Sequence, residues 1–200
     1  MSNRIGTLQR KTAETDIKVT VNLDGTGQAN VKTGNGVLDH FIAQLARHGS
    51  IDIDLAAKGD YLITGWHHTT EDAAICLGRA LREAIGDGVG IRRMGHALVP
   101  LDEALAQVAV DFSGRGYGVV ELGISDGRVG DLPGDLIRHF LQTLAVEARI
   151  TLHAKVLTGV NAHHRAEATF KALARALSDA VTLDPRRAGQ APSTKGTISG

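Results

Sequence analysis

The sequence is poor in cysteine, in net charge and in long apolar runs, and each shortage excludes a class of protein. Its 200 residues include one cysteine, Cys76, which excludes an intramolecular disulfide framework and a cysteine-rich zinc module. The 22 basic and 22 acidic residues cancel, which removes the bulk attraction that a general nucleic-acid binder needs. No run approaches the roughly 18 apolar residues of a membrane span, and residues 1–11 lack the apolar centre of a signal peptide. We therefore expect a soluble, cytoplasmic protein with neither a nucleic-acid nor a membrane partner.

Histidine, by contrast, is abundant, and its positions indicate an internal duplication. Residues 38–46 read Leu-Asp-His-Phe-Ile-Ala-Gln-Leu-Ala, and residues 137–145 read Ile-Arg-His-Phe-Leu-Gln-Thr-Leu-Ala. A His-His-x-x-Glu motif follows each segment, at residues 67–71 and 163–167. Two similar segments in the same order, with histidine at matching places, predict a repeat. We place its halves at about 1–93 and 94–183 of a single domain, followed by a tail at 184–200.

The two halves have matching patterns of predicted secondary structure. Alternating and β-branched segments predict strands at 16–22, 28–32, 50–56, 104–112, 118–122 and 150–157. Amphipathic spacing predicts helices at 37–47, 69–85, 136–147 and 163–181. The turn residues 24–27 predict that strand 28–32 returns beside strand 16–22 as a hairpin. The tail has no periodicity, so composition alone predicts disorder there.

These elements predict an α+β fold. Each half is a β-β-α-β-α type unit, and the natural packing of two such units is sheet, helices, sheet. For the whole chain we expect an internal duplication with two four-stranded sheets that sandwich a layer of helices.

The duplicated His-His-x-x-Glu motif is the best candidate for a metal site. A spacing of four residues places His67 with Glu71, and His163 with Glu167, on one face of each helix. The adjacent histidines are rotated by about 100° and point elsewhere. With one histidine from each preceding helix, the duplication predicts two sites of three histidines and one glutamate. A partition that respects the repeat is His67, Glu71, His139 and His164 for one site, and His40, His68, His163 and Glu167 for the other.

Two alternatives remain open at this point. A single His-His-x-x-Glu motif can be a capping and solubility pattern, and His153 could be a ligand in place of His139. The repeat favours His139, because the residue that corresponds to His153 in the first half is Asp54. Imidazole and carboxylate ligands without thiolate favour manganese, iron or zinc over magnesium or calcium.

A second set of residues suits a small phosphate ester. These are basic or hydroxyl groups in glycine-rich or turn contexts, or on the last helix: Arg92, Arg93, Arg115, Lys171, Ser193, Thr194 and Lys195. The carboxylates left for acid–base chemistry are Glu14, Asp102 and Glu103, and composition does not choose among them. His48 either serves the substrate or caps the end of its helix.

A series of short motifs runs through nearly the whole chain. They include Arg10-Lys11-Thr12-Ala13-Glu14-Thr15, Leu38-Asp39-His40, Arg47-His48-Gly49, Gly59-Asp60, His67-His68-Thr69-Thr70-Glu71-Asp72, Pro100-Leu101-Asp102-Glu103-Ala104-Leu105, Asp111-Phe112-Ser113-Gly114-Arg115, Asn161-Ala162-His163-His164 and Pro192-Ser193-Thr194-Lys195-Gly196. With these motifs the chain resembles the imidazoleglycerol-phosphate dehydratase family of histidine biosynthesis.

The resemblance implies a reaction, a cofactor and an assembly. The reaction is metal-dependent dehydration of imidazole glycerol phosphate to imidazole acetol phosphate and water. It implies two Mn²⁺ ions per active site, a substrate ring held as a metal-bridging imidazolate, a diazafulvene-like intermediate, and an enol that becomes the ketone. It also implies a homo-oligomer of 24 subunits with active sites built between subunits.

The resemblance implies residue roles as well. Glu14 moves protons, and His48 and Asp102 are its partners at the substrate hydroxyls. The phosphate group is bound by Arg93, Arg115, Lys171, Ser193 and Lys195, so the tail should order against the phosphate or a neighbouring subunit. In two places the chain departs from the family: Asn35-Gly36-Val37 replaces Ile-Pro-Phe, and Gly65-Trp66 replaces an aspartate before the first histidine pair.

Two other functions are compatible with the residues alone. One is a non-catalytic module in which the histidine motifs only hold subunits together. The other is a two-metal phosphohydrolase, which a site rich in histidine and poor in aspartate disfavours.

Overall fold

The computed structural model describes residues 4–124 and 126–198. The elements of the first half are β1 (Ile5–Lys11), β2 (Thr15–Asn22), β3 (Ala29–Lys32), α1 (Gly36–Gly49), β4 (Asp52–Gly59), α2 (Tyr61–Thr64) and α3 (His67–Ile85). Those of the second half are β5 (Met94–Leu101), β6 (Ala104–Asp111), β7 (Tyr117–Glu121), β8 (Arg128–Val129), β9 (Leu132–Pro133), α4 (Gly134–Glu147), β10 (Thr151–Thr158) and α5 (Ala162–Val181), followed by a 3-10 turn at Pro185–Arg187.

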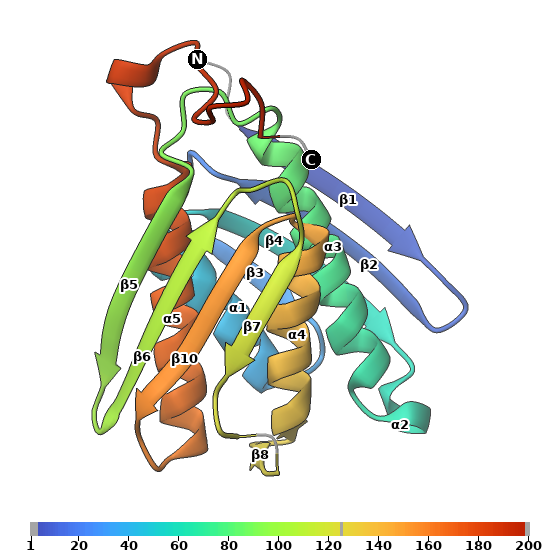
Figure 1. The fold of residues 1–200 in the computed structure, drawn as a ribbon. Coiled ribbons are helices and arrows are strands. Elements are labelled where there is room, and N and C mark those ends of the chain that lie inside the picture. The colour runs from blue at the N-terminus through green and yellow to red at the C-terminus, as the bar shows by residue number, and fades with distance from the viewer. Residues whose placement is uncertain (1–3, 125, 199–200) are drawn as a thin grey trace.

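The two halves form two sheets with the same topology. The first sheet has the strand order β1-β2-β4-β3 and the second has the order β5-β6-β10-β7. In each sheet the last pair, β3 with β4 or β7 with β10, is parallel and the other pairs are antiparallel. The helices lie between the sheets (Figure 1). The predicted α+β sandwich of two four-stranded sheets is confirmed.

Two features of the sheets differ from the sequence prediction. Strand β3 does not pair with β2, so the predicted hairpin is wrong. Strand β4 lies between them, and its residue Asp54 has Thr20 of β2 as its neighbour on one side and Asn30 of β3 on the other. The central position suits β4 because its inward residues Ile53 and Leu55 are buried. Each half also starts with a strand that the pattern did not reveal, β1 or β5, which completes the four strands.

The edge strands β1 and β5 lie directly on helices. A methyl group at Gly6 of β1 would stand 1.9 Å from the carbonyl oxygen of Ala80 in α3. A methyl group at Gly95 of β5 would stand 2.1 Å from the carbonyl oxygen of Ala176 in α5. Glycine at these equivalent positions therefore permits the close approach of strand to helix.

The helix layer pairs elements from different halves. Helix α1 packs against α5, and α3 packs against α4. Both pairs run in the same direction: His40 lies beside His163 near one end of the first pair, and Gly49 lies beside Ala174 towards the other. Below the histidines, the fully buried Phe41 and Phe170 stack with their ring centroids 4.9 Å apart. The start of every paired helix therefore lies at the same end of the layer.

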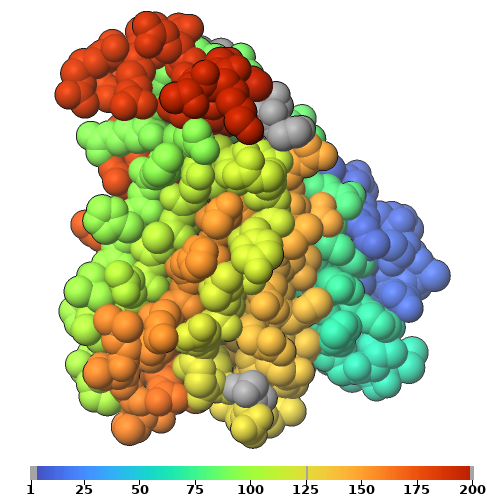
Figure 2. Space-filling view, in the orientation of Figure 1, coloured from blue at the N-terminus to red at the C-terminus, as the bar shows by residue number. Residues whose placement is uncertain are grey.

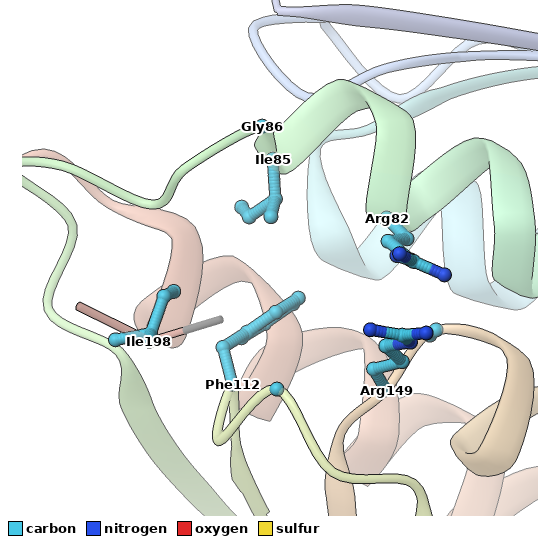
Figure 3. A pocket seen from close by; sticks show the side chains of 8 residues that line it. Arg82, Ile85, Gly86, Phe112, Arg149 and Ile198 are labelled. Atoms are coloured by element: carbon cyan, nitrogen blue, oxygen red, sulfur yellow. The ribbon is translucent and has the colours of Figure 1, made fainter. Parts of the chain in front are cut away.

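The described part of the tail packs on the body of the protein, so the disorder expected from composition is wrong for residues 184–198. Arg93 donates a hydrogen bond to the Pro192 carbonyl at 2.9 Å, and the Gly90 amide donates one to Gln190 at 3.0 Å. Ile198 is buried and lines a cavity of about 120 Å³ together with Phe112. Figure 2 shows the tail lying over one end of the molecule, and Figure 3 shows Ile198 in the cavity.

Two predicted ranges reach residues that the structure does not describe. The first half, predicted to begin at residue 1, includes Met1–Asn3, and the tail predicted at 184–200 includes Ser199 and Gly200. Among the described residues, no helix is both long enough and apolar enough to cross a membrane.

Candidate active site

One histidine–carboxylate cluster joins the starts of α1 and α5. The Nε2 atoms of His40 and His163 both lie 2.9 Å from Oε2 of Glu167. The two imidazoles stack with their centroids 5.5 Å apart. Asn35 and Asn161 cap the two helices with their side-chain oxygens, which fixes where each helix begins. We call His40, His163 and Glu167 the α1–α5 cluster.

Glu167 remains ionised within this cluster. Burial alone would raise its pKa, but hydrogen bonds from Lys171 and His40 outweigh burial and bring the pKa to about 2. Lys171 lies one turn further along α5, with Nζ 2.7 Å from Oε1 of Glu167. The carboxylate thus presents one oxygen to Lys171 and the other to both imidazoles.

A matching cluster joins the starts of α3 and α4. His139 Nε2 lies 3.0 Å from Oε1 of Glu71, and His139 stacks on His67 with a centroid distance of 5.2 Å. We call His67, Glu71 and His139 the α3–α4 cluster. His139 therefore occupies the place that the repeat predicts, whereas His153 lies on the outer face of the second sheet.

The second histidine of each pair points away from both clusters. His68 Nδ1 lies 3.1 Å from Oδ2 of Asp60 and 3.7 Å from Oε2 of Glu14. The hydrogen bond with Asp60 raises the pKa of His68. The predicted partition therefore forms only in part within one chain, since His68 does not reach His40, His163 or Glu167.

His164 has the corresponding environment in the second half. Its Nδ1 lies 2.7 Å from Oε2 of Glu103, and its Nε2 lies 3.8 Å from Oδ2 of Asp102. The hydrogen bond between His164 and Glu103 lowers the pKa of Glu103 to about 2 and raises that of His164. The sequence did not assign Asp60 a role, and it left Glu103 unassigned among three carboxylates.

The two clusters have the composition of transition-metal sites. Each brings two imidazole nitrogens and one carboxylate oxygen within 4.8 Å of one another, with no thiolate. Three convergent donors of this kind leave room for further ligands and fit Mn, Fe or Zn. The residues present therefore fit the metal that the sequence resemblance implies.

Four of the five predicted phosphate-binding residues meet at a second place, beside the tail. A cavity of about 230 Å³ is lined by Arg93, Ser113, Arg115, Ser193, Thr194, Lys195, Thr197 and Ile198. Arg93 is held by Asp111, with Nε 2.7 Å from Oδ1. In the part of the chain that the structure describes, Arg115 and Lys195 have no ion-pair partner, so two cations are available to an anion. We call this cavity the tail pocket.

The tail pocket and the clusters lie at opposite ends of the helix layer. The Arg93 amide donates a hydrogen bond to the carbonyl of Ala180, near the end of α5, whereas His163 stands at its start. Seventeen residues of helix separate these positions by about 25 Å. Lys171, the fifth predicted phosphate ligand, lies beside the α1–α5 cluster.

His48 lies in the last turn of α1, apart from Glu14 and Asp102. Partial burial and the nearby cation of Lys171 lower its pKa. Within one chain the three predicted catalytic residues are thus distributed over three places: Glu14 beside His68, Asp102 beside His164, and His48 near Lys171.

The two departures from the family pattern have local structural roles. Asn35 is buried, caps α1 through its oxygen, and donates from Nδ2 to Asp131 at 3.0 Å. Trp66 stacks on Tyr61 with a centroid distance of 4.3 Å directly before the first histidine pair.

Comparisons with known proteins point to one family. A family model described as imidazoleglycerol-phosphate dehydratase matches residues 33–177. The imidazoleglycerol-phosphate dehydratase of Dehalococcoides mccartyi (strain CBDB1) is 52% identical over 198 residues, which cover 99% of both chains. That of Synechococcus elongatus is 51% identical over 195 residues, covering 98% of this chain and 93% of the relative.

Solved structures agree with the fold over most of the chain. The crystal structure of imidazoleglycerol-phosphate dehydratase from Staphylococcus aureus superposes with a TM-score of 0.80 at 34% identity, covering 90% of this chain and 99% of the other. The structure from Pyrococcus furiosus also gives a TM-score of 0.80, at 37% identity, and covers 94% and 99% of the two chains.

The duplicated fold, the paired clusters and these relatives define an enzyme of the hydro-lyase class, which removes water from its substrate. More specifically, the chain belongs to the imidazoleglycerol-phosphate dehydratase family and acts in histidine biosynthesis.

Proposed function

We propose that the enzyme dehydrates imidazole glycerol phosphate to imidazole acetol phosphate and water in a manganese-dependent reaction. The observation that carries the proposal is the pair of equivalent His-His-Glu clusters, each with three donor atoms within 4.8 Å. Bound Mn²⁺ ions, two per active site, would hold the substrate imidazole and stabilise negative charge on its ring. The α1–α5 cluster would provide three ligands for one ion and the α3–α4 cluster three ligands for the other.

Glu14 is the proposed proton carrier. Its side chain is 56% exposed, and it stands next to His68, so it can reach a substrate bound at this histidine. The carboxylate removes the proton from the carbon that bears the second hydroxyl and delivers it to the hydroxyl on the carbon beside the ring, which leaves as water. The substrate passes through a diazafulvene-like form, and the resulting enol becomes the ketone.

The remaining predicted residues bind and orient the substrate. The tail pocket offers Arg93, Arg115 and Lys195 to a phosphate dianion, together with the hydroxyl of Ser193. Asp102 and His48 are proposed partners at the two hydroxyls. Lys171 has a proposed share in phosphate binding when the tail pocket of another subunit approaches it.

We further propose a homo-oligomer of 24 subunits with active sites between subunits. The separation of about 25 Å between the tail pocket and the clusters supports a shared site, because a single small phosphate ester does not span that distance within one chain. The outward orientation of His68 and His164 supports it as well, since each could complete a cluster on a neighbouring subunit.

The test is turnover of imidazole glycerol phosphate by purified protein. Metal-free protein should be inactive, and Mn²⁺ should restore formation of an enolisable ketone without release of inorganic phosphate. Glu14→Gln should abolish turnover while metal binding and assembly size remain unchanged. A metal-replete, assembled wild type with no dehydratase activity would refute the proposed reaction, and phosphate release would favour a phosphohydrolase.

A further inference from the structure

The two halves hold the second histidine of their pairs with carboxylates from different places. In the second half, Nδ1 of His164 lies 2.7 Å from Glu103, which belongs to the turn between β5 and β6. In the first half, Nδ1 of His68 lies 3.1 Å from Asp60, which stands between β4 and α2. In both cases the contact is at Nδ1, on the side of the ring opposite Nε2, and Nε2 of His164 lies 3.8 Å from Oδ2 of Asp102.

Glu14 is the counterpart of Glu103 in the duplicated fold. The buried positions of β2 begin at Thr15 and those of β6 begin at Ala104, so residues 14 and 103 occupy the same place in their turns. Both carboxylates face the second histidine of their half, but at different distances. Glu103 is hydrogen-bonded to His164, whereas Glu14 stands 3.7 Å from His68.

Glu103 is fixed on both of its oxygens, and Glu14 is not. Oε1 of Glu103 accepts hydrogen bonds from the amides of Val160 and Asn161, at 3.1 and 2.8 Å, while Oε2 contacts His164. Among the described residues, the Glu14 carboxylate has one side-chain contact, with Oε2 3.7 Å from Nδ1 of His68. Glu14 and Glu103 therefore occupy equivalent positions, but hydrogen bonds hold the side chain of Glu103 in place and not that of Glu14.

Asp60 has no counterpart in the second half. The connection from the strand to the histidine pair covers residues 60–66 in the first half and 159–162 in the second. The first connection is three residues longer, and it contains the four-residue helix α2, which follows Asp60 directly. Thr64, at the end of α2, donates a hydrogen bond to Oδ1 of Asp60 at 2.9 Å, so the insertion orients the carboxylate towards His68.

We infer that Asp60 and Glu103 are positioning residues that keep the proton of His68 and His164 on Nδ1 and leave Nε2 free for a metal ion, and that Asp60 thereby releases Glu14 for proton transfer. An ionised carboxylate only accepts hydrogen bonds, so the ring nitrogen that faces it must carry the proton. Histidines that bind metals commonly donate their other N–H to a carboxylate. The inference rests on the proposed function, because it assigns Glu14 the role of proton carrier.

The test measures Mn²⁺ affinity by chelator competition on the assembled protein, without substrate. Asp60→Ala and Glu103→Ala should each weaken the affinity by about 10–100-fold. Asp60→Asn should stay close to wild type, because the amide oxygen still accepts the Nδ1 proton. Glu121→Gln serves as the matched control, since Glu121 pairs with Lys155 on an exposed part of the second sheet. Size-exclusion chromatography verifies that every variant has the wild-type assembly.

A double-mutant cycle tests the release of Glu14. Glu14→Gln should leave the affinity unchanged in the wild-type background but lower it further in the Asp60→Ala background, where Glu14 replaces Asp60 as the partner of His68. At saturating Mn²⁺, Asp60→Ala should lower kcat with little change in KM, because Glu14 is then bound to His68. Asp60→Asn should restore kcat.

Three results would overturn the inference. The first is an Mn²⁺ affinity of Asp60→Ala equal to that of the Glu121→Gln control. The second is a double-mutant cycle in which the effects of Asp60→Ala and Glu14→Gln on the affinity are additive. The third is an Asp60→Ala protein that binds one Mn²⁺ fewer while its remaining sites keep the wild-type affinity. The last would identify Glu14, Asp60 and His68, whose donor atoms also lie within 4.8 Å, as a third metal site. A wild type that binds Mn²⁺ but dehydrates nothing refutes the proposed reaction and leaves the affinity results interpretable.

Discussion

Replacement of Gly6 or Gly95 by alanine should destabilise the protein through a clash that the structure defines. The new methyl group of Gly6→Ala would lie 1.9 Å from the Ala80 carbonyl oxygen and 2.8 Å from the Ala84 amide nitrogen. Ordinary contact begins at 3.4 Å, so β1 must move away from α3 by about 1.5 Å. Gly95→Ala meets Ala176 and Ala180 at nearly the same distances. Overpacking against backbone costs about 1–3 kcal/mol.

Thermal unfolding of the metal-free protein at one fixed concentration measures this effect. In a chain of this length, 1 kcal/mol corresponds to about 2–4 °C in Tm, so each variant should melt about 2–12 °C below wild type. The matched control is Gly36→Ala, because a methyl group there meets nothing within 4 Å and lies in a helix, where alanine is favoured. Its Tm should equal or exceed that of wild type. Equal melting temperatures for Gly6→Ala and Gly36→Ala would refute the argument.

Three further predictions concern single side chains. Asn35→Ala should lower the free energy of unfolding by about 1 kcal/mol through the lost cap of α1, and by more if Asp131 is left unpaired. Urea unfolding measures this free energy, and an unchanged value would contradict the capping role. Burial raises the pKa of the Cys76 thiol to about 11, so a thiol reagent at pH 8 should label the unfolded but not the folded protein. Rapid labelling of the folded protein would contradict this burial. The Arg4 hydrogen bond lowers the pKa of Asp24 below 3.8. Wild type should therefore be more stable than Asp24→Asn at neutral pH, by under about 1 kcal/mol, and this difference should vanish as the pH falls below 3.8. A difference in stability that grows in acid would contradict the assigned sign.

The sequence predicted the repeated parts of the fold well and the edges of the sheets poorly. Strands β2 and β6 alternate between buried and exposed residues, so their pattern is readable. Strand β1 has polar residues on its outer face and Gly6 at its buried inner position, and glycine reads as a strand breaker. The pairing of β3 was predicted wrongly because the Asp-Gly turn before it favours a hairpin locally, whereas burial of β4 decides the strand order.

The candidate site was predictable as far as the duplication reaches. His40, His67, His139 and His163 recur at fixed offsets, and the structure brings them together in two clusters. Asp60 was missed because its role depends on a difference between the halves, the longer connection that contains α2, and not on their similarity. The length of the connection before each histidine pair was a signal that could have identified it. The distance between the tail pocket and the clusters depends on helix orientation, which a linear pattern does not contain.

The pairing of helices across the halves bears on how such a molecule could arise. Each cluster takes one histidine from one half and a histidine with a glutamate from the other, so neither half contains a complete cluster. An ancestral chain of half the present length would have needed a second copy of itself to build any cluster, and that dimer would have had two identical ones. In a fused chain the two clusters no longer need to be identical. Thereafter one turn could retain its carboxylate on histidine, as Glu103 does, while the other acquired Asp60 and left Glu14 uncommitted.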